Sequence, residues 1–92
     1  MKVVLTKDAI RDLNSIRLHI SLESPRAAVR VTTRLMDACD SLAFFPERGR
    51  RGSEPGTRES VVVRPYVIVY RIVLEQVDIL RVWHAAQNRT AE

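Results

Sequence analysis

The spacing of apolar residues changes once along this chain of 92 residues, and that change constrains the fold more than any other feature. In the first half, apolar residues recur every three or four positions, which is the spacing of one buried face of a helix. They do so at Ala9, Leu13, Ile16 and Ile20, and again at Ala28, Val31, Leu35, Ala38 and Leu42. From Arg58 onward they alternate with a period of two, as in half-buried strands. Helices followed by strands predict an α+β fold.

Capping residues set the predicted limits of the helices. Residues 3–5 form a short β-type run, and Thr6 then occupies an N-cap position, so we expect a strand followed by a helix over about 7–22. Ser24-Pro25 is typical of an N-cap with proline at the first helical position, where the missing N–H costs nothing. The second helix is expected to end near Phe45-Pro46. Together they predict a helical hairpin.

The second half predicts a loop and three strands. Residues 46–57 contain all three glycines and two of the four prolines, which is typical of a loop. Three runs rich in β-branched and aromatic residues follow, at 61–63, 67–74 and 77–83. The predicted fold class is therefore α+β: an N-terminal strand, a helical hairpin, and then a three-stranded antiparallel meander.

Length and composition exclude several classes of protein. Ninety-two residues predict a single domain over 1–92. The one cysteine, Cys39, has no partner for a disulfide, and the Cys and His pairs of a structural zinc site are missing, so no metal or cofactor is expected. Apolar stretches are interrupted well short of the roughly 20 residues that span a bilayer. We expect a cytoplasmic protein without a membrane partner.

Positive charge is concentrated in one part of the chain. The net charge is +4, from 15 basic and 11 acidic residues, and residues 46–71 alone hold six arginines against three glutamates. Thirteen of the fifteen basic residues are arginine, whose planar group binds phosphates and carboxylates bidentately. Genome base composition explains such a bias equally well. The charge favours an acidic partner, which is a nucleic acid, an acidic protein segment or a membrane surface.

Strand alternation predicts which side chains face away from the helices. The helix-facing set is predicted as Val61, Val63, Ile68, Tyr70, Ile72, Leu80 and Val82. The opposite set is Arg58, Val62, Arg64, Val67, Val69, Arg71, Ile79, Arg81 and Trp83. In one interpretation these arginines are solvated or paired with Glu59, Glu75 or Asp78. In the other they form a basic, partly apolar surface for a phosphate backbone or an acidic peptide.

Candidate catalytic side chains are few. His84 follows the last predicted strand beside Arg81 and Trp83, where it is either a hydrogen-bonded structural residue or an exposed general acid or base. His19 falls within the first helix without a companion at ligand spacing, so we interpret it as a surface or boundary residue. Cys39 is expected to pack within the second helix. Phosphate-binding glycine loops, paired carboxylates and Gly-x-Ser-x-Gly elbows are missing.

Three segments together resemble one known family. They are Gly56-Thr57-Arg58-Glu59, then 65–71 with the sequence PYVIVYR, then 79–87 with the sequence ILRVWHAAQ. These residues resemble the RelE/ParE superfamily of small bacterial toxins, also called plasmid stabilisation proteins, over nearly the whole chain. The resemblance implies a small sheet backed by a helical hairpin. It also implies a cognate antitoxin, a small acidic protein whose C-terminal segment wraps the toxin.

The superfamily has two mechanistic branches. RelE-like toxins cleave mRNA in the ribosomal A site, and the resemblance would then assign catalysis to Arg58, Arg64, Arg81 and His84. ParE-like toxins inhibit DNA gyrase. The C-terminus lacks tyrosine, the loop and sheet lack lysine, and residues 85–89 look more like the ParE side. We therefore favour gyrase as the target and keep the ribosome as the alternative.

The same surface residues are expected to bind the antitoxin or the target. They are Arg58, Arg64, Arg71, Arg81 and Trp83. Two further interpretations stay open, namely a nucleic-acid-binding module and a family member that has lost toxicity. Growth arrest on expression and salt-dependent nucleic-acid binding distinguish them.

Overall fold

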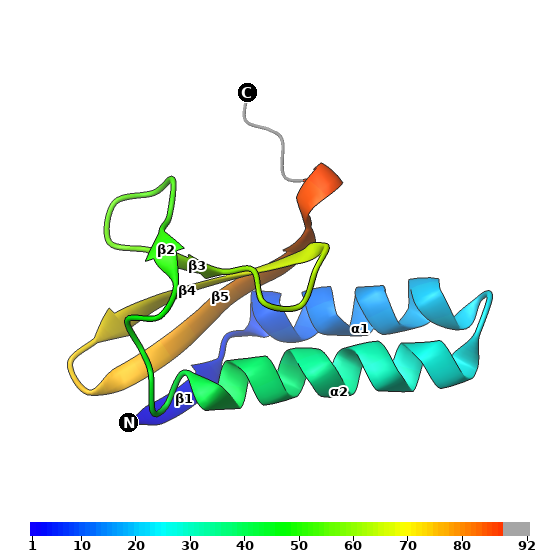
Figure 1. Cartoon of the computed structure of the whole chain (residues 1–92), viewed down its shortest axis with the longest axis horizontal. Helices are drawn as coiled ribbons and strands as arrows, with labels where there is room; N and C mark the ends of the chain where they lie inside the picture. The colour runs from blue at the N-terminus through cyan, green and yellow to red at the C-terminus, as the bar shows by residue number, and fades with distance from the viewer. Residues whose placement is uncertain (88–92) are drawn as a thin grey trace.

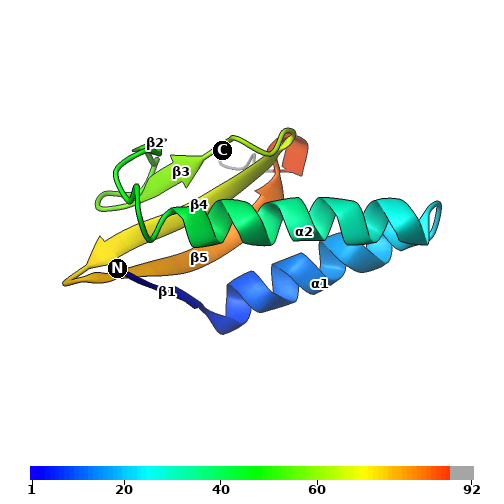
Figure 2. The same cartoon turned by 60° about the horizontal axis from the view of Figure 1, so that its bottom comes forward.

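The computed structural model describes residues 1–87, which form two layers. A hairpin of two helices packs on one face of a five-stranded sheet (Figures 1 and 2). The loop that joins the helices projects beyond the sheet (Figure 1). In chain order the elements are β1 (Lys2–Leu5), α1 (Lys7–Ser21), α2 (Pro25–Ser41), β2 (Arg50–Arg51), β3 (Arg58–Ser60), β4 (Tyr66–Val73), β5 (Gln76–His84) and a 3-10 turn (Ala85–Gln87). Within residues 1–87, neither helix is long and apolar enough to cross a membrane.

Both predicted N-caps are confirmed. The Thr6 side chain accepts a hydrogen bond from the backbone N–H of Ala9, and the Ser24 side chain accepts one from Ala27. Helix α2 ends at Ser41, earlier than expected. Beyond it the backbone continues as turns, because the N–H groups of residues 42–44 donate to carbonyls three residues back instead of four.

The sheet has the strand order β1-β5-β4-β3-β2. Strand β1 pairs with β5 in parallel, and the other neighbours are antiparallel. The short strand β2 lies inside the segment predicted as a loop, so the sheet has one strand more than expected. The predicted strand at 61–63 is wrong. The pairing of β3 with β4 ends at Ser60, because the chain then turns back, and the N–H of Tyr66 donates to the Val63 carbonyl.

A β-bulge in β5 changes which side chains face the helices. Val69 lies opposite Arg81, but Tyr70 lies opposite Ile79, so Leu80 is the extra residue. Ile79 is therefore fully buried under the helices, whereas Leu80 is only partly buried. The predicted orientations of Ile79 and Leu80 are wrong for this reason.

The core lies between the hairpin and the sheet. Its buried residues come from both helices, from the C-cap of α2, from β4 and β5, and from the turn before β4. They are Ala9, Leu13, Leu35, Ala38, Cys39, Leu42, Val63, Ile68, Tyr70, Val77, Ile79 and Val82. Most of the apolar stripes recognised in the helices lie here, so the helical periodicity identified the buried face correctly.

Candidate functional site

The face of the sheet that points away from the helices carries a charged row. Arg50, Glu59, Val69 and Arg81 lie opposite one another on β2, β3, β4 and β5. Directly opposite residues of antiparallel strands share one face. We call this surface the open face, and define it by Arg50, Glu59, Val67, Val69, Arg71, Asp78, Arg81 and Trp83.

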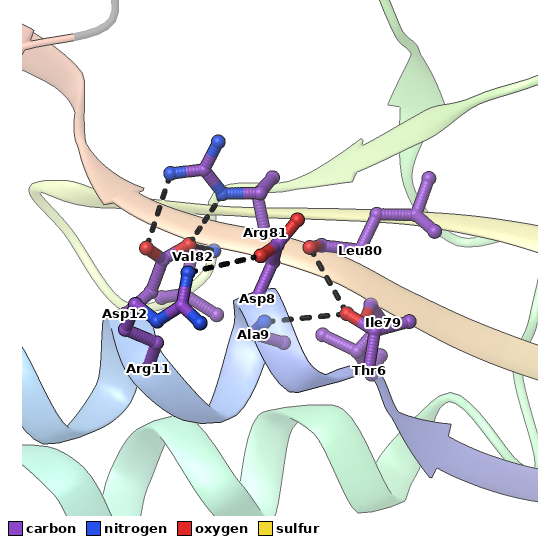
Figure 3. Close-up of polar contacts among 9 residues, drawn as sticks. All are labelled: Thr6, Asp8, Ala9, Arg11, Asp12, Ile79, Leu80, Arg81 and Val82. Atoms are coloured by element: carbon purple, nitrogen blue, oxygen red, sulfur yellow. Dashed lines mark hydrogen bonds and ion pairs between the residues drawn. The ribbon is translucent and has the colours of Figure 1, made fainter.

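Arg81 is anchored to helix α1. Its guanidinium donates to both carboxylate oxygens of Asp12, with N to O distances of 2.7 and 3.1 Å (Figure 3). This hydrogen bond raises the pKa of Arg81. The guanidinium also lies 5.1 Å from the ring centre of Trp83, a cation–π contact. Arg81 is thus held in place before any partner binds.

The N-terminus of α1 also completes the edge of β5. Strand β1 pairs only as far as Ile79, so in the part of the chain that the structure describes the following residues of β5 have no neighbouring strand on that side. Asp12 instead accepts a hydrogen bond from the N–H of Val82, and the Thr6 hydroxyl donates to the carbonyls of Ile79 and Leu80 at the bulge (Figure 3). The N-cap residue Thr6 and the α1 residue Asp12 therefore fix the geometry on which the position of Arg81 depends.

The other arginines of this region differ in their pairing. Arg50 forms an ion pair of 2.9 Å with the buried Glu59. Arg71 and Arg64 are exposed and make no ion pair with residues 1–87. Arg64 lies in the turn before β4 and lines a cavity of about 350 Å³ together with Arg50. Arg71 therefore lies on the open face opposite Asp78 without a direct ion pair, and Arg64 is an exposed cation in the turn before β4.

The prediction for Arg58 is wrong. Arg58 lies opposite Tyr70, so it shares the helix-facing side of the sheet. Its guanidinium donates to the carbonyls of Glu47 and Gly49, at 3.3 and 2.9 Å. The Tyr70 hydroxyl donates to the Pro46 carbonyl at 2.7 Å and accepts from the Gly49 N–H at 3.0 Å. The pairing of β3 with β4 begins at Arg58, before the valine run in which the sequence predicted the strand. Arg50 of β2, and not Arg58, therefore lies on the open face.

His84 also lies on the helix-facing side. It pairs with Tyr66 across the sheet, and the two rings meet edge to face, 5.6 Å between centres. Its Nδ1 accepts a hydrogen bond from the Ala86 N–H at 3.0 Å. Both rings line a cleft of about 330 Å³ with Ser15, Ile16 and His19. The structure therefore separates His84 from the arginines of the open face.

Residues 3–89 match the family described as "ParE toxin of type II toxin-antitoxin system, parDE". The chain belongs to the ParE toxin family. Toxin RelE2 of Caulobacter vibrioides is 49% identical over 86 residues, covering 94% of this chain and 97% of that protein. Putative toxin Y4kP of Sinorhizobium fredii is 45% identical over 84 residues, covering 90% and 86%.

Solved structures agree with this assignment. The chromosomal ParDE TA system from P. aeruginosa is similar with a TM-score of 0.81 and 25% identity, over 91% of this chain and 95% of that one. The toxin–antitoxin complex RelBE2 from Mycobacterium tuberculosis is similar with a TM-score of 0.68 and 28% identity, over 90% and 95%. This ParE-family chain is a type II toxin of the ParE/RelE superfamily. Its relatives carry both RelE and ParE names, so similarity alone does not separate the two targets.

The structure also places His19 and Cys39, the other two candidates from the sequence. His19 is exposed, as expected, but lies at the same cleft as His84, a proximity that only the packing of α1 on the sheet creates. Cys39 is fully buried, as predicted, and burial raises the pKa of its thiol to about 12. Within residues 1–87, no group of three or more His, Cys, Asp or Glu side chains is arranged to hold a metal ion.

Proposed function

We propose that this toxin arrests growth by inhibiting DNA gyrase, and that a cognate acidic antitoxin neutralises it. One observation carries the choice of target. The residues that would cleave mRNA lie on different sides of the sheet, with Arg81 on the open face and His84 and Arg58 on the helix-facing side.

Cleavage of RNA needs a proton-transferring side chain next to the cations that stabilise the phosphate. The guanidinium of Arg81 is bound to Asp12, and one terminal nitrogen of Arg58 is bound to two backbone carbonyls on the other side of the sheet. His84 uses Nδ1 to accept from Ala86 and faces Tyr66. Within residues 1–87, His84 therefore makes no hydrogen bond to Arg58, Arg64 or Arg81. This arrangement supports a toxin that acts by binding its target, as the gyrase-directed branch does.

The antitoxin is proposed to contact the open face and its rim. Arg64 and Arg71 offer exposed cations for its carboxylates, and Val62 and Val73 are large exposed apolar residues nearby. Val67, Val69 and Ile79, which the sequence placed on the partner-facing surface, are buried and offer the partner little contact area. A partner covering this face would block the target-binding surface by direct competition.

A groove between the helices suits another part of the same partner. It is a largely apolar cavity of about 390 Å³, with Leu5, Ile10, Leu13 and Met36 in its lining. Ile10 and Met36 are themselves exposed. An amphipathic helix places apolar residues three or four apart into such a groove. We assign the groove to a helical segment of the antitoxin.

Pulse labelling after induction of the toxin tests this function in cells. Inhibition of gyrase should stop DNA synthesis before protein synthesis, and co-expression of the antitoxin should restore growth. A nuclease would stop protein synthesis first. Unimpaired growth at verified expression would instead identify a family member without toxicity.

A further inference from the structure

Two arginines face each other directly across β2 and β3. Arg51 pairs with Arg58, and both side chains line one cavity of about 630 Å³. Like charges directly opposite in a sheet destabilise it. Neither arginine forms an ion pair with the acidic residues of the part of the chain that the structure describes. The fold therefore holds two positive charges side by side without an internal counter-charge in contact.

The rest of the cavity is built by the connection between these strands. The N–H of Gly52 donates to the Thr57 carbonyl, and both the N–H and the hydroxyl of Thr57 donate to the Glu54 carbonyl. Gly56 has a φ of 82°, which a tight turn after proline requires. These bonds close the connection into a defined shape. The wall of the cavity is therefore ordered before a ligand arrives.

The arginine pair is also held in position. One terminal nitrogen of Arg58 is bound to the carbonyls of Glu47 and Gly49, which leaves its other N–H groups without an acceptor in residues 1–87. Arg51 is exposed and makes no hydrogen bond through its side chain within the same residues. The cavity is thus lined by the guanidinium of Arg58, which backbone carbonyls hold in place, and by that of Arg51, which no hydrogen bond within residues 1–87 holds.

We propose that this cavity binds a phosphate group of a nucleic-acid backbone. Two guanidinium groups on one anion need an acceptor with several oxygens, which a phosphate provides. The lining also contains Ile72 and Pro55, against which a sugar or base can pack. Glu54 lines the cavity as well, and its carboxylate accepts hydrogen bonds from sugar hydroxyls or base amino groups. A nucleotide carries both the phosphate and these donors.

This site goes beyond the proposed inhibition of gyrase and does not depend on it. The two arginines lie on the helix-facing side of the sheet, whereas the surface assigned to the antitoxin lies mainly on the open face. Binding of phosphate is measured on the toxin alone. Failure of this proposal and failure of the gyrase proposal are therefore separate results.

Two titrations followed by amide NMR test the site on the purified toxin. The probes are inorganic phosphate and a 12-base-pair DNA duplex, with sodium chloride at equal ionic strength as the reference. The variant is Arg51→Gln, because the Arg51 side chain makes no ion pair or hydrogen bond within residues 1–87. Arg30→Gln, an exposed residue of α2, is the matched control with the same change of charge.

We expect both probes to give saturable shifts in the amides of residues 51–58. Arg51→Gln should weaken duplex binding about fivefold and reduce its salt dependence by about one phosphate contact, whereas Arg30→Gln should not. Equal behaviour of the two variants would overturn the proposal. Shifts spread evenly over the chain, or saturation by neither probe, would overturn it too. Saturation by phosphate alone would limit the site to a free phosphate ion and contradict the nucleic-acid assignment.

Discussion

Asp12 and Arg81 join the first helix to the edge of the sheet. The Asp12 carboxylate accepts two hydrogen bonds from the Arg81 guanidinium and a third, of 2.9 Å, from the N–H of Val82 (Figure 3). One side chain thus replaces a missing neighbour strand and also orients a cation on the open face. Stability and the binding surface depend on the same carboxylate.

Removing this carboxylate should therefore destabilise the toxin. We expect Asp12→Ala to lower the free energy of unfolding by about 2 kcal/mol, because a partly buried N–H and a guanidinium lose their acceptor. Asp12→Asn keeps one acceptor oxygen and should lose less. Urea denaturation at neutral pH measures both. A free energy of unfolding for Asp12→Ala within about 0.5 kcal/mol of the parent would show that this junction contributes little.

The Tyr70 hydroxyl should stabilise the segment from Pro46 to Gly49. It makes two hydrogen bonds there from a fully buried position, so Tyr70→Phe should cost about 1–3 kcal/mol without changing the packing. Tyr66→Phe on the same strand is the control, since no hydrogen bond of its hydroxyl to residues 1–87 is present. Thermal unfolding compares the two, and equal losses of stability would contradict the assigned role.

The buried thiol of Cys39 should make stability fall at alkaline pH. Burial, aided by the charge of Asp40, raises the pKa of Cys39 from 9.0 to about 12. Between these values the unfolded chain releases the proton and the folded chain keeps it, so the free energy of unfolding falls as pH rises. The slope from this group is at most about 1.4 kcal/mol per pH unit. Above pH 9 the free energy of unfolding of Cys39→Ala should fall less steeply with pH than that of the parent, and below pH 9 the two pH slopes should be equal. Identical slopes above pH 9 would count against a protonated buried thiol.

Arg71 should contribute to antitoxin binding through its exposed charge. We expect Arg71→Glu to weaken the complex about tenfold, more at low salt than at high salt, because a like charge would then face the acidic partner. Arg30→Glu on the exposed surface of α2 carries the same change of charge and should have a smaller effect. Titration calorimetry with the cognate antitoxin measures both. Equal affinities of the two variants would exclude the open face as the main acidic contact.

The helices were predictable because their signals are local. Thr6 and Ser24 act as N-caps within three residues of their bonding partners, and the apolar stripes follow a period that a few turns reveal. The second helix was predicted too long because the apolar pattern continues past Ser41, although the backbone there forms turns with hydrogen bonds to the carbonyl three residues back. The sequence therefore predicted the hairpin and its buried face, and missed mainly where α2 ends.

The sheet was harder to predict because its register depends on distant residues. Val61, Val62 and Val63 favour a strand intrinsically, but pairing with β4 ends at Ser60. The bulge at Leu80 has no local signal, since the Thr6 hydroxyl and the Asp12 carboxylate that stabilise it lie some seventy residues away in the chain. One such residue changes the face of every side chain on one side of it. The bulge is why Ile79 was predicted on the wrong face. Arg58 was predicted on the wrong face because the sequence placed its strand at 61–63 and the structure places it at Arg58–Ser60.

The most direct test of the target combines two reactions with the purified toxin and its His84→Ala variant. One measures supercoiling of plasmid DNA by gyrase, and the other measures cleavage of mRNA in reconstituted translation. Because His84 faces Tyr66 and not the arginines of the open face, both proteins should inhibit gyrase equally and leave ribosome-bound mRNA intact. A general acid or base contributes about 100-fold or more. Codon-position cleavage of mRNA that His84→Ala abolishes, with gyrase unaffected, would contradict the account and make this toxin a nuclease.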